Sequence, residues 1–222
     1  MPPEVVPPEV GADDDEDRRY LAEHFSVPRE TMGRLSDYAT LLVEWQARMN
    51  LVGPATLPHL WARHFLDSAQ LLDHAPGRPL DWLDLGSGAG FPGLVIAIMR
   101  PHVTMTLVES RAKKCAFLKE VAKHCGVADR VTVLAERAEA LPSARFDVIS
   151  ARALASLSQL FDWGLRFAES DTLWLLPKGA SVESELADAR KTFGFSAQLR
   201  PSITDPAARI VLAHGVQRRS RK

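Results

Sequence analysis

The sequence predicts an α/β protein: a mostly parallel sheet of seven strands, with an antiparallel strand near the C-terminus and a small helical cap in front. From residue 80 onward, short runs of β-forming residues alternate with helical patterns, which is typical of a parallel sheet covered by helices on both faces. The last two runs have only a loop between them, so they form a hairpin in which one strand runs antiparallel. A chain of 222 residues that is 46% hydrophobic can bury the core of such a domain.

The N-terminal part of the chain divides at residue 17. Residues 1–17 contain two Pro-Pro pairs and the acidic run Asp13–Asp17, with almost nothing to pack, so we expect a disordered tail. Residues 18–77 are expected to form the helical cap. Apolar residues recur there at three- and four-residue intervals from Leu35 to Trp45 and again from Leu60 to Leu72, and glycine and proline turn signals separate these two helices.

The α/β domain is expected to span residues 78–215, followed by a basic tail at 216–222. Each strand is recognised by a short run of β-branched, aliphatic and aromatic residues, and each helix by apolar residues at helical spacing. The expected strands are 80–85, 103–108, 131–134, 146–150, 172–176, 195–199 and 209–212, and the expected helices are 94–99, 111–125, 154–168 and 182–192.

A glycine loop follows the first strand of this domain. Asp84 lies near the end of the strand, and glycines then alternate with other residues at Gly86, Gly88 and Gly90. A strand, a tight loop and a helix N-terminus together hold nucleotide-like cofactors on backbone N–H groups. The dinucleotide fingerprint needs its third glycine one position later, where this chain has Phe91. The G-x-G-x-G spacing resembles instead the S-adenosylmethionine loop of Rossmann-like methyltransferases.

A second acidic position fits a cofactor that contains a ribose. Glu109 follows Gly86 by 23 residues, at the end of the second strand, where a carboxylate accepts hydrogen bonds from ribose hydroxyls. Nicotinamide cofactors and S-adenosylmethionine would both use this carboxylate, so it does not separate the two.

If the substrate is a nucleic-acid base, the residues near the fourth strand restrict which of its atoms can be methylated. Methylation of an exocyclic amino group calls for an Asn/Asp-Pro-Pro-aromatic motif there, and the chain has Ser150-Ala151-Arg152-Ala153 instead. Methylation of a pyrimidine C5 needs a thiolate nucleophile, but Cys115 and Cys125 lie on the helix after the second strand, away from the expected target side. Guanine N7 has a lone pair and no proton, so methyl transfer to it needs positioning and no general base. The sequence permits this reaction without proving it.

Five motifs occur in an order and spacing that a generic glycine loop does not have. They are Trp45 with Asn50-Leu51, Arg63-His64-Phe65-Leu66-Asp67-Ser68, the stretch Leu83–Gly93 ending in Gly90-Phe91-Pro92-Gly93, Arg137-Ala138-Glu139, and Ser150-Ala151-Arg152-Ala153. In these motifs the chain resembles the RsmG family, the bacterial 16S ribosomal RNA guanine-N7 methyltransferases also called glucose-inhibited division protein B. The resemblance covers roughly residues 41–212.

The resemblance implies a Rossmann-like class I methyltransferase fold, S-adenosyl-L-methionine as the cofactor, and 16S ribosomal RNA of the small ribosomal subunit as the partner. It places Gly86 and Phe91 against the cofactor, Ala138-Glu139 beside the adenosine, and Arg152 beside the methionine end. With the loop and strand-end positions, the expected cofactor-binding residues are Asp84, Gly86, Ser87, Gly88, Gly90, Phe91, Glu109, Ala138, Glu139 and Arg152.

No residue is assigned a certain catalytic role. Arg152, His64 and Asp67 are candidates for positioning, and the last two lie three residues apart on one helical face, where they could equally brace the helix. Two positions depart from the family pattern, because Gln46 replaces an Asn after the tryptophan and Val52 replaces a Thr. Both changes fall in the cap and put its role toward RNA in doubt.

Several broader expectations complete the prediction. The formal net charge of −1, with an acidic start and a basic end, permits a nucleic-acid partner without requiring one. We expect a cytoplasmic monomer with no membrane segment and no metal site. Alternative functions are a small-molecule methyltransferase, an NAD(P)-dependent oxidoreductase and a ribosome-assembly binding protein.

Overall fold

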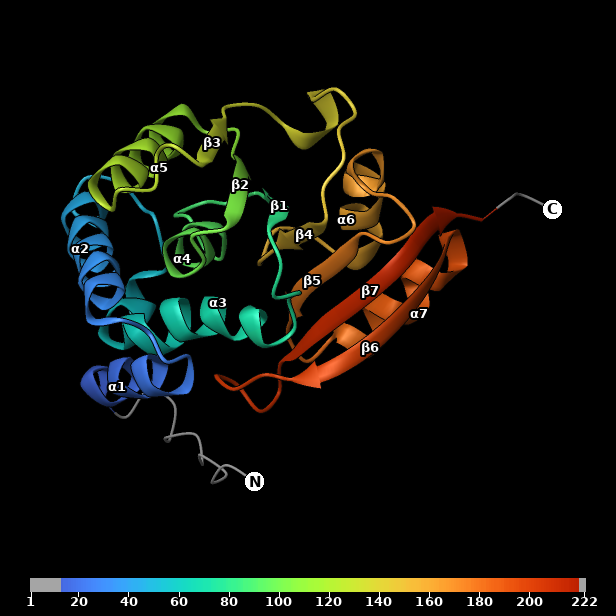
Figure 1. Ribbon diagram of the computed structural model, residues 1–222. Helices are drawn as coiled ribbons and strands as arrows, with labels where there is room; N and C mark the ends of the chain where they lie inside the picture. Colours follow the sequence, from blue (N-terminus) through green and yellow to red (C-terminus); the bar gives the residue numbers. More distant parts are fainter. Residues whose placement is uncertain (1–12, 220–222) are drawn as a thin grey trace.

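A seven-stranded sheet forms the centre of the protein, for which the computed structural model describes residues 13–219 (Figure 1). The strand order is β3-β2-β1-β4-β5-β7-β6. Neighbouring strands pair in parallel from β3 to β5, whereas β7 runs antiparallel to both β5 and β6, which confirms the expected hairpin. The strands are β1 (Leu80–Leu85), β2 (Val103–Val108), β3 (Val131–Leu134), β4 (Val148–Ala151), β5 (Leu173–Lys178), β6 (Phe193–Pro201) and β7 (Arg209–Arg218).

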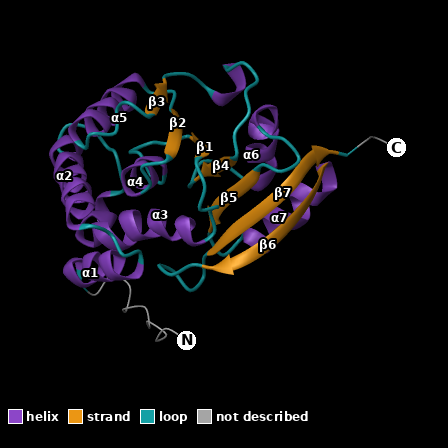
Figure 2. Cartoon of the chain, in the orientation of Figure 1, coloured by secondary structure: helices purple, strands orange, loops and turns teal. Residues whose placement is uncertain are grey.

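Helices cover the sheet on both faces (Figure 2). The side chains of each strand alternate between two cores. In β1, for example, Trp82 belongs to the core shared with the cap, and Leu83 belongs to the core on the other face. The first core lies against α4 (Gly93–Met99) and α5 (Ala112–His124). The second lies against α6 (Leu157–Gly164) and α7 (Val182–Thr192).

The helical cap packs on α4 and α5 rather than forming a separate core. Its long helix α2 presents Leu35, Tyr38 and Leu42 as fully buried side chains, as the helical spacing predicts. The second expected helix, 60–72, is divided by its hydrogen bonding into a π-turn, a short α-helix and a 3-10 turn. The elements of the cap are α1 (Asp14–His24), α2 (Arg29–Gln46), η1 (Pro54–His59), η2 (Trp61–Leu66), α3 (Asp67–Ala69) and η3 (Gln70–Asp73).

The expected boundary of the disordered tail at residue 17 is wrong, because α1 begins at Asp14. Asp13 caps the helix by accepting from the Asp15 amide at 2.9 Å, and the acidic side chains of the first turn face the positive end of the helix dipole. The Asp14 carboxylate also accepts from the Trp61 amide at 2.8 Å, which joins α1 to η2. The same acidic run that lowers hydrophobicity therefore starts a helix. Residues 1–12 of the expected tail lie outside the described residues.

The basic C-terminal segment also starts later than residue 216. Strand β7 continues to Arg218, whose backbone pairs with Phe193 at the start of β6. The Arg218 guanidinium forms an ion pair with Asp162 and lies over the Phe193 ring. Pairing with the long edge strand explains the extension, since each added residue gains ladder hydrogen bonds. Residues 220–222 lie outside the described part of the chain.

The remaining elements of the α/β domain are the start of α6 and two 3-10 turns. The helix expected from 154 begins at Leu157, because Ser156 acts as its N-cap. The 3-10 turns η4 (Ala138–Ala140) and η5 (Leu165–Phe167) follow β3 and α6. Between residues 13 and 219 no helix is both long and apolar enough to cross a membrane.

Candidate active site

The glycine loop between β1 and α4 adopts a backbone conformation that requires glycine. Gly86, Gly88 and Gly90 have φ values of +65°, +58° and +95°. A Cβ on Gly86 would lie 2.5 Å from Leu154 Cδ1, and a Cβ on Gly90 would lie 2.6 Å from the Tyr38 hydroxyl oxygen. Close packing from both sides therefore fixes the loop at the carboxyl edge of the sheet.

Asp84 is fully buried behind the glycine loop, and its carboxylate accepts hydrogen bonds that support the loop. One carboxylate oxygen accepts from the Ser150 hydroxyl at 2.7 Å, and the other accepts from the Gly93 amide at 3.3 Å. Burial raises the pKa of Asp84 to about 6, and these hydrogen bonds oppose the rise. Asp84 and Gly90, two of the expected cofactor-binding residues, do not line the cavity beside the loop; they shape the backbone that does.

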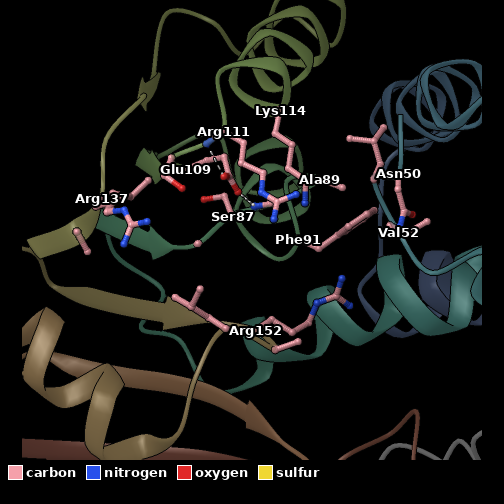
Figure 3. Close-up of a pocket in the computed structure, with 18 of the residues that line it drawn as sticks. Asn50, Val52, Ser87, Ala89, Phe91, Glu109, Arg111, Lys114, Arg137 and Arg152 are labelled. Carbon is pink, nitrogen blue, oxygen red and sulfur yellow. Dashed lines mark hydrogen bonds between the residues drawn. The ribbon is translucent and has the colours of Figure 1, made fainter. Parts of the chain in front are cut away.

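A cavity of about 720 Å³ lies over the carboxyl ends of β1, β2 and β4 (Figure 3). Most of the expected cofactor-binding residues line it: Gly86, Ser87, Gly88, Phe91, Glu109, Ala138, Glu139 and Arg152. The positioning candidate His64 lines it as well. The cavity is also lined by Arg111, Lys114 and Asn50–Gly53, which are not among the expected cofactor-binding residues. Arg111 and Lys114 follow the strand-end acid Glu109 by two and five residues, and this nearness in the sequence could have pointed to them.

Glu109 holds its carboxylate at the edge of the cavity. One oxygen accepts from the Gly88 amide at 3.1 Å, and the other accepts from the Arg111 amide at 2.8 Å. An ionised carboxylate has about four acceptor sites, so the group keeps capacity for the two hydroxyls of a ribose. These two backbone bonds orient Glu109 without using up its acceptors.

The cap closes the other side of the cavity. The Gln46 side-chain oxygen accepts from the Leu51 and Val52 amides at 2.9 and 3.0 Å, and its nitrogen donates to the Val52 carbonyl at 2.9 Å. Gln46 thus holds the segment Asn50–Val52 against the cavity, as Figure 3 shows for Asn50 and Val52. Gln46, which departs from the family pattern, therefore helps to build the cavity wall.

The three positioning candidates come together in space. Arg152 donates to Asp67 Oδ2 and to the Arg63 carbonyl, each at 3.0 Å, and to His64 Nδ1 at 2.9 Å. Its guanidinium also lies 5.0 Å from the centre of the Phe91 ring. Protein acceptors therefore fix the guanidinium, and the cluster joins the end of β4 to η2 in the cap and to Phe91 at the end of the glycine loop.

His64 is neutral within this cluster. Burial is the main cause that lowers its pKa, and the positive charges of Arg152 and Arg63 lower it further, to about 3. Because Nδ1 accepts from Arg152, the ring proton is assigned to Nε2, which donates to the Thr56 hydroxyl at 2.7 Å. Thr56 in turn donates to the Gly53 carbonyl at 2.7 Å, so both ring nitrogens of His64 and the Thr56 hydroxyl are hydrogen-bonded.

Comparison with known proteins agrees with the motifs. The sequence model of the family described as "rRNA small subunit methyltransferase G" (GidB) matches residues 31–208. The chain belongs to this family.

Curated members of the GidB family align along most of the chain. A protein of Rhizorhabdus wittichii named "Ribosomal RNA small subunit methyltransferase G" is 47% identical over 196 residues, covering 88% of this chain and 90% of its own. A protein of Methylobacterium nodulans with the same name is 48% identical over 202 residues, covering 88% and 93%. The chain is thus a GidB-family methyltransferase over nearly its full length.

Solved structures agree with this GidB chain at the level of the fold. A TehB-like SAM-dependent methyltransferase from Corynebacterium glutamicum superposes with a TM-score of 0.54 at 14% identity, covering 82% of this chain and 97% of that one. The P. horikoshii TYW2 protein in complex with MeSAdo gives 0.55 at 15% identity, covering 74% and 64%. The fold is therefore the expected Rossmann-like methyltransferase fold.

A second cavity of about 610 Å³ lies beside the first in this GidB chain. The two cavities share His64, Arg152, Ala153 and Leu154 in their walls. Ala153 has a φ of +50°, which is unusual for a residue with a side chain and is found at sites where the chain is held under constraint. The wall between the two neighbouring cavities is thus formed by His64 and Arg152, two of the positioning candidates, and by the constrained segment at Ala153.

Proposed function

We propose that the chain transfers the methyl group of S-adenosylmethionine to N7 of a specific guanine in 16S ribosomal RNA of the small subunit. The observation that carries this proposal is a cofactor-sized cavity with a second cavity next to it, divided by Arg152, in a chain of the GidB family. A cavity of about 720 Å³ fits a ligand of this size. The name of the relatives, ribosomal RNA small subunit methyltransferase G, supports RNA as the class of substrate.

The residues of the first cavity fit S-adenosylmethionine. The Glu109 carboxylate matches ribose hydroxyls, the loop at Gly86–Gly88 allows close approach of the methionine part, and Ala138-Glu139 lies where the adenine would be read. When bound, the cofactor supplies an electrophilic methyl group on a sulfonium. The chain's own part is to bind it, to exclude water and to hold the acceptor in line with that methyl group.

The titratable groups of the site favour an acceptor that needs no base. His64 has a pKa of about 3 and is already bonded on both ring nitrogens, so it is a poor proton acceptor. Burial raises the pKa of Cys125 to about 12 and raises that of Cys115 as well, which leaves neither thiol suited to act as a nucleophile. Guanine N7 carries no proton and reacts through its lone pair, which suits these groups.

Tritiated methyl transfer tests this function. The full chain is incubated with labelled S-adenosylmethionine and small subunits from cells that lack the methylation, and the modified nucleotide is then mapped. We expect one guanine to carry the label at N7. Labelling of a metabolite fraction in place of RNA, or binding to small subunits with no transfer, would refute the proposal in favour of a small-molecule enzyme or an assembly protein.

A further inference from the structure

We propose that Asp205 and Arg63, at the rim of the second cavity, read the Watson–Crick edge of the target guanine. Asp205 lies on the loop between β6 and β7, and Arg63 lies on η2 in the cap. Both residues line the second cavity and stand outside the cofactor cavity. The inference rests on the proposed function and adds to it the pair of side chains that selects the base.

The second cavity is placed to receive an acceptor base. It opens at the carboxyl ends of β4 and β5 and shares the Arg152–Leu154 segment with the cofactor cavity. Leu154 is 39% exposed, although it is large and apolar, and it lies over Gly86 between the two cavities. A flat base that leaves an RNA stack needs an apolar surface against its face, and Leu154 offers one beside the cofactor loop.

Two of the three carboxylates that line the second cavity are occupied by protein donors. Asp67 accepts from Arg152 at 3.0 Å and from the Thr204 hydroxyl at 2.8 Å. Glu185 accepts from Lys178 and from the Leu157 amide, each at 2.9 Å. These two groups brace the walls of the cavity and have little capacity for a ligand.

Asp205 and Arg63 are the charged pair with capacity left. Asp205 uses Oδ1 in a turn bond from the Ala207 amide at 2.9 Å, and its Oδ2 lies 3.9 Å from the Arg63 guanidinium, too far for a hydrogen bond. The Asp205 and Arg63 side chains are 40% and 48% exposed. By contrast, Lys178 is 9% exposed and donates to the Ala155 carbonyl as well as to Glu185, so protein acceptors already hold its ammonium group.

Methylation at N7 requires that guanine be recognised by its Watson–Crick edge, which Asp205 and Arg63 can bind. A hydrogen-bond donor placed on N7 would occupy the lone pair that takes the methyl group, so the Hoogsteen edge cannot be fully bound. On the Watson–Crick edge, guanine presents the N1 and N2 donors beside the O6 acceptor. A carboxylate matches the two donors, and a guanidinium matches O6. Adenine presents an N1 acceptor and an N6 donor, which is the opposite order and is rejected.

Replacing the target guanine by inosine removes only its N2 amino group and so tests the contact directly. Small subunits are reconstituted with guanosine or inosine at the mapped position, and kcat/KM for methyl transfer is measured with the full chain. For the unchanged protein we expect inosine to react roughly 10-fold or more slowly, the effect of one lost hydrogen bond to a charged group. In Asp205→Ser, whose hydroxyl can keep the turn bond, we expect the guanine rate to fall and the two bases to react about equally.

Two further variants complete the experiment. Asp205→Asn keeps the turn bond through its Oδ1 and changes the other acceptor to a donor, so it should also lose the preference for guanine. Asp188→Asn removes an exposed charge on α7 and should behave like the unchanged protein. If guanine is methylated but the unchanged protein does not distinguish inosine, or the Asp205 variants retain the full preference, the inference is wrong. If the unchanged protein methylates no guanine at N7, the proposed function itself fails.

Discussion

At the scale of single residues, Arg152 has the most partners in the site. Its guanidinium donates to the His64 ring nitrogen, the Asp67 carboxylate and the Arg63 backbone carbonyl, which lie within five consecutive residues of the cap. Only a planar group with several fixed donors can serve these acceptors together. Arg152 therefore sets the position of the wall between the two cavities.

We expect Arg152→Lys to lower methyl transfer by roughly 10-fold or more, since an ammonium cannot reach all three acceptors and leaves one or two charged hydrogen bonds unmade. Initial rates on undermethylated small subunits measure this. Arg145→Lys, at an exposed arginine that pairs with Glu169, is the matched control and should change little. Equal rates for both variants would show that the guanidinium geometry is not needed.

His64 should make stability depend on pH. Its pKa is about 3 in the folded protein and near 6.5 when unfolded, so the unfolded state binds more protons between these values. Its contribution to stability is therefore full above pH 6.5 and is lost as pH falls toward 3. From pH 6.5 to 4.5 we expect His64→Gln to gain roughly 2 kcal/mol relative to the unchanged protein, measured by urea unfolding. Gln198→Ala, at an exposed position on β6, changes no titratable group and should keep a constant difference across this range.

At the scale of elements, α2 and the glycine loop form one unit. The Tyr38 hydroxyl donates to the Ala89 carbonyl, and its ring stacks on Phe91 with centroids 5.2 Å apart. A helix of the cap thus fixes the backbone of a loop that starts 48 residues later, at Gly86. Cofactor binding should depend on this contact, although Tyr38 does not line the cavity.

We expect Tyr38→Phe to weaken S-adenosylmethionine binding by roughly 3- to 10-fold, because the buried Ala89 carbonyl loses its partner and the loop becomes less ordered. Calorimetric titration with S-adenosylhomocysteine measures the change. Tyr20→Phe removes a hydroxyl that faces His24 on α1, far from the loop, and serves as the control. Unchanged affinity in Tyr38→Phe would show that the glycines hold the loop without the cap.

At the scale of the whole molecule, the buried amide of Gln70 joins the cap to the C-terminal hairpin, beside the bond from Thr204 to Asp67. Gln70 donates to Asp67 Oδ1 at 2.9 Å and to the Ser202 hydroxyl at 3.2 Å, and it accepts from the Ile203 amide at 2.8 Å. The bonds to Ser202 and Ile203 link residues more than 130 positions apart in the sequence. They also support the loop that carries Asp205.

We expect Gln70→Leu to lower the free energy of unfolding by roughly 2–4 kcal/mol, because the side chain is 1% exposed and its loss leaves several buried polar groups unpaired. Urea denaturation followed by circular dichroism measures this. Gln198→Leu, at an exposed position on β6, is the control. A similar small change in both variants would mean that the cap and the hairpin are stable independently.

The sequence by itself determined the features that depend on local order along the chain. The alternation of strands and helices, the glycine loop after Asp84 and the acid at Glu109 follow from residue periodicity and from fixed spacing, and the structure has them where they are expected. Local rules reach only a few residues, however. They give the strand at 209–212 without its extension to Arg218, which depends on pairing with β6.

Only the tertiary structure decided which distant side chains meet. Arg152 and Asp67 are 85 residues apart, and nothing in their local sequence predicts that they pair or that Asp84 is sealed behind the loop. The local sequence around Asp205 likewise predicts only a turn between two strands and does not predict that Asp205 lies near Arg63. The physical reason is that these contacts depend on how the cap and the hairpin close over the sheet, which is a property of packing and not of the order of residues in any one segment.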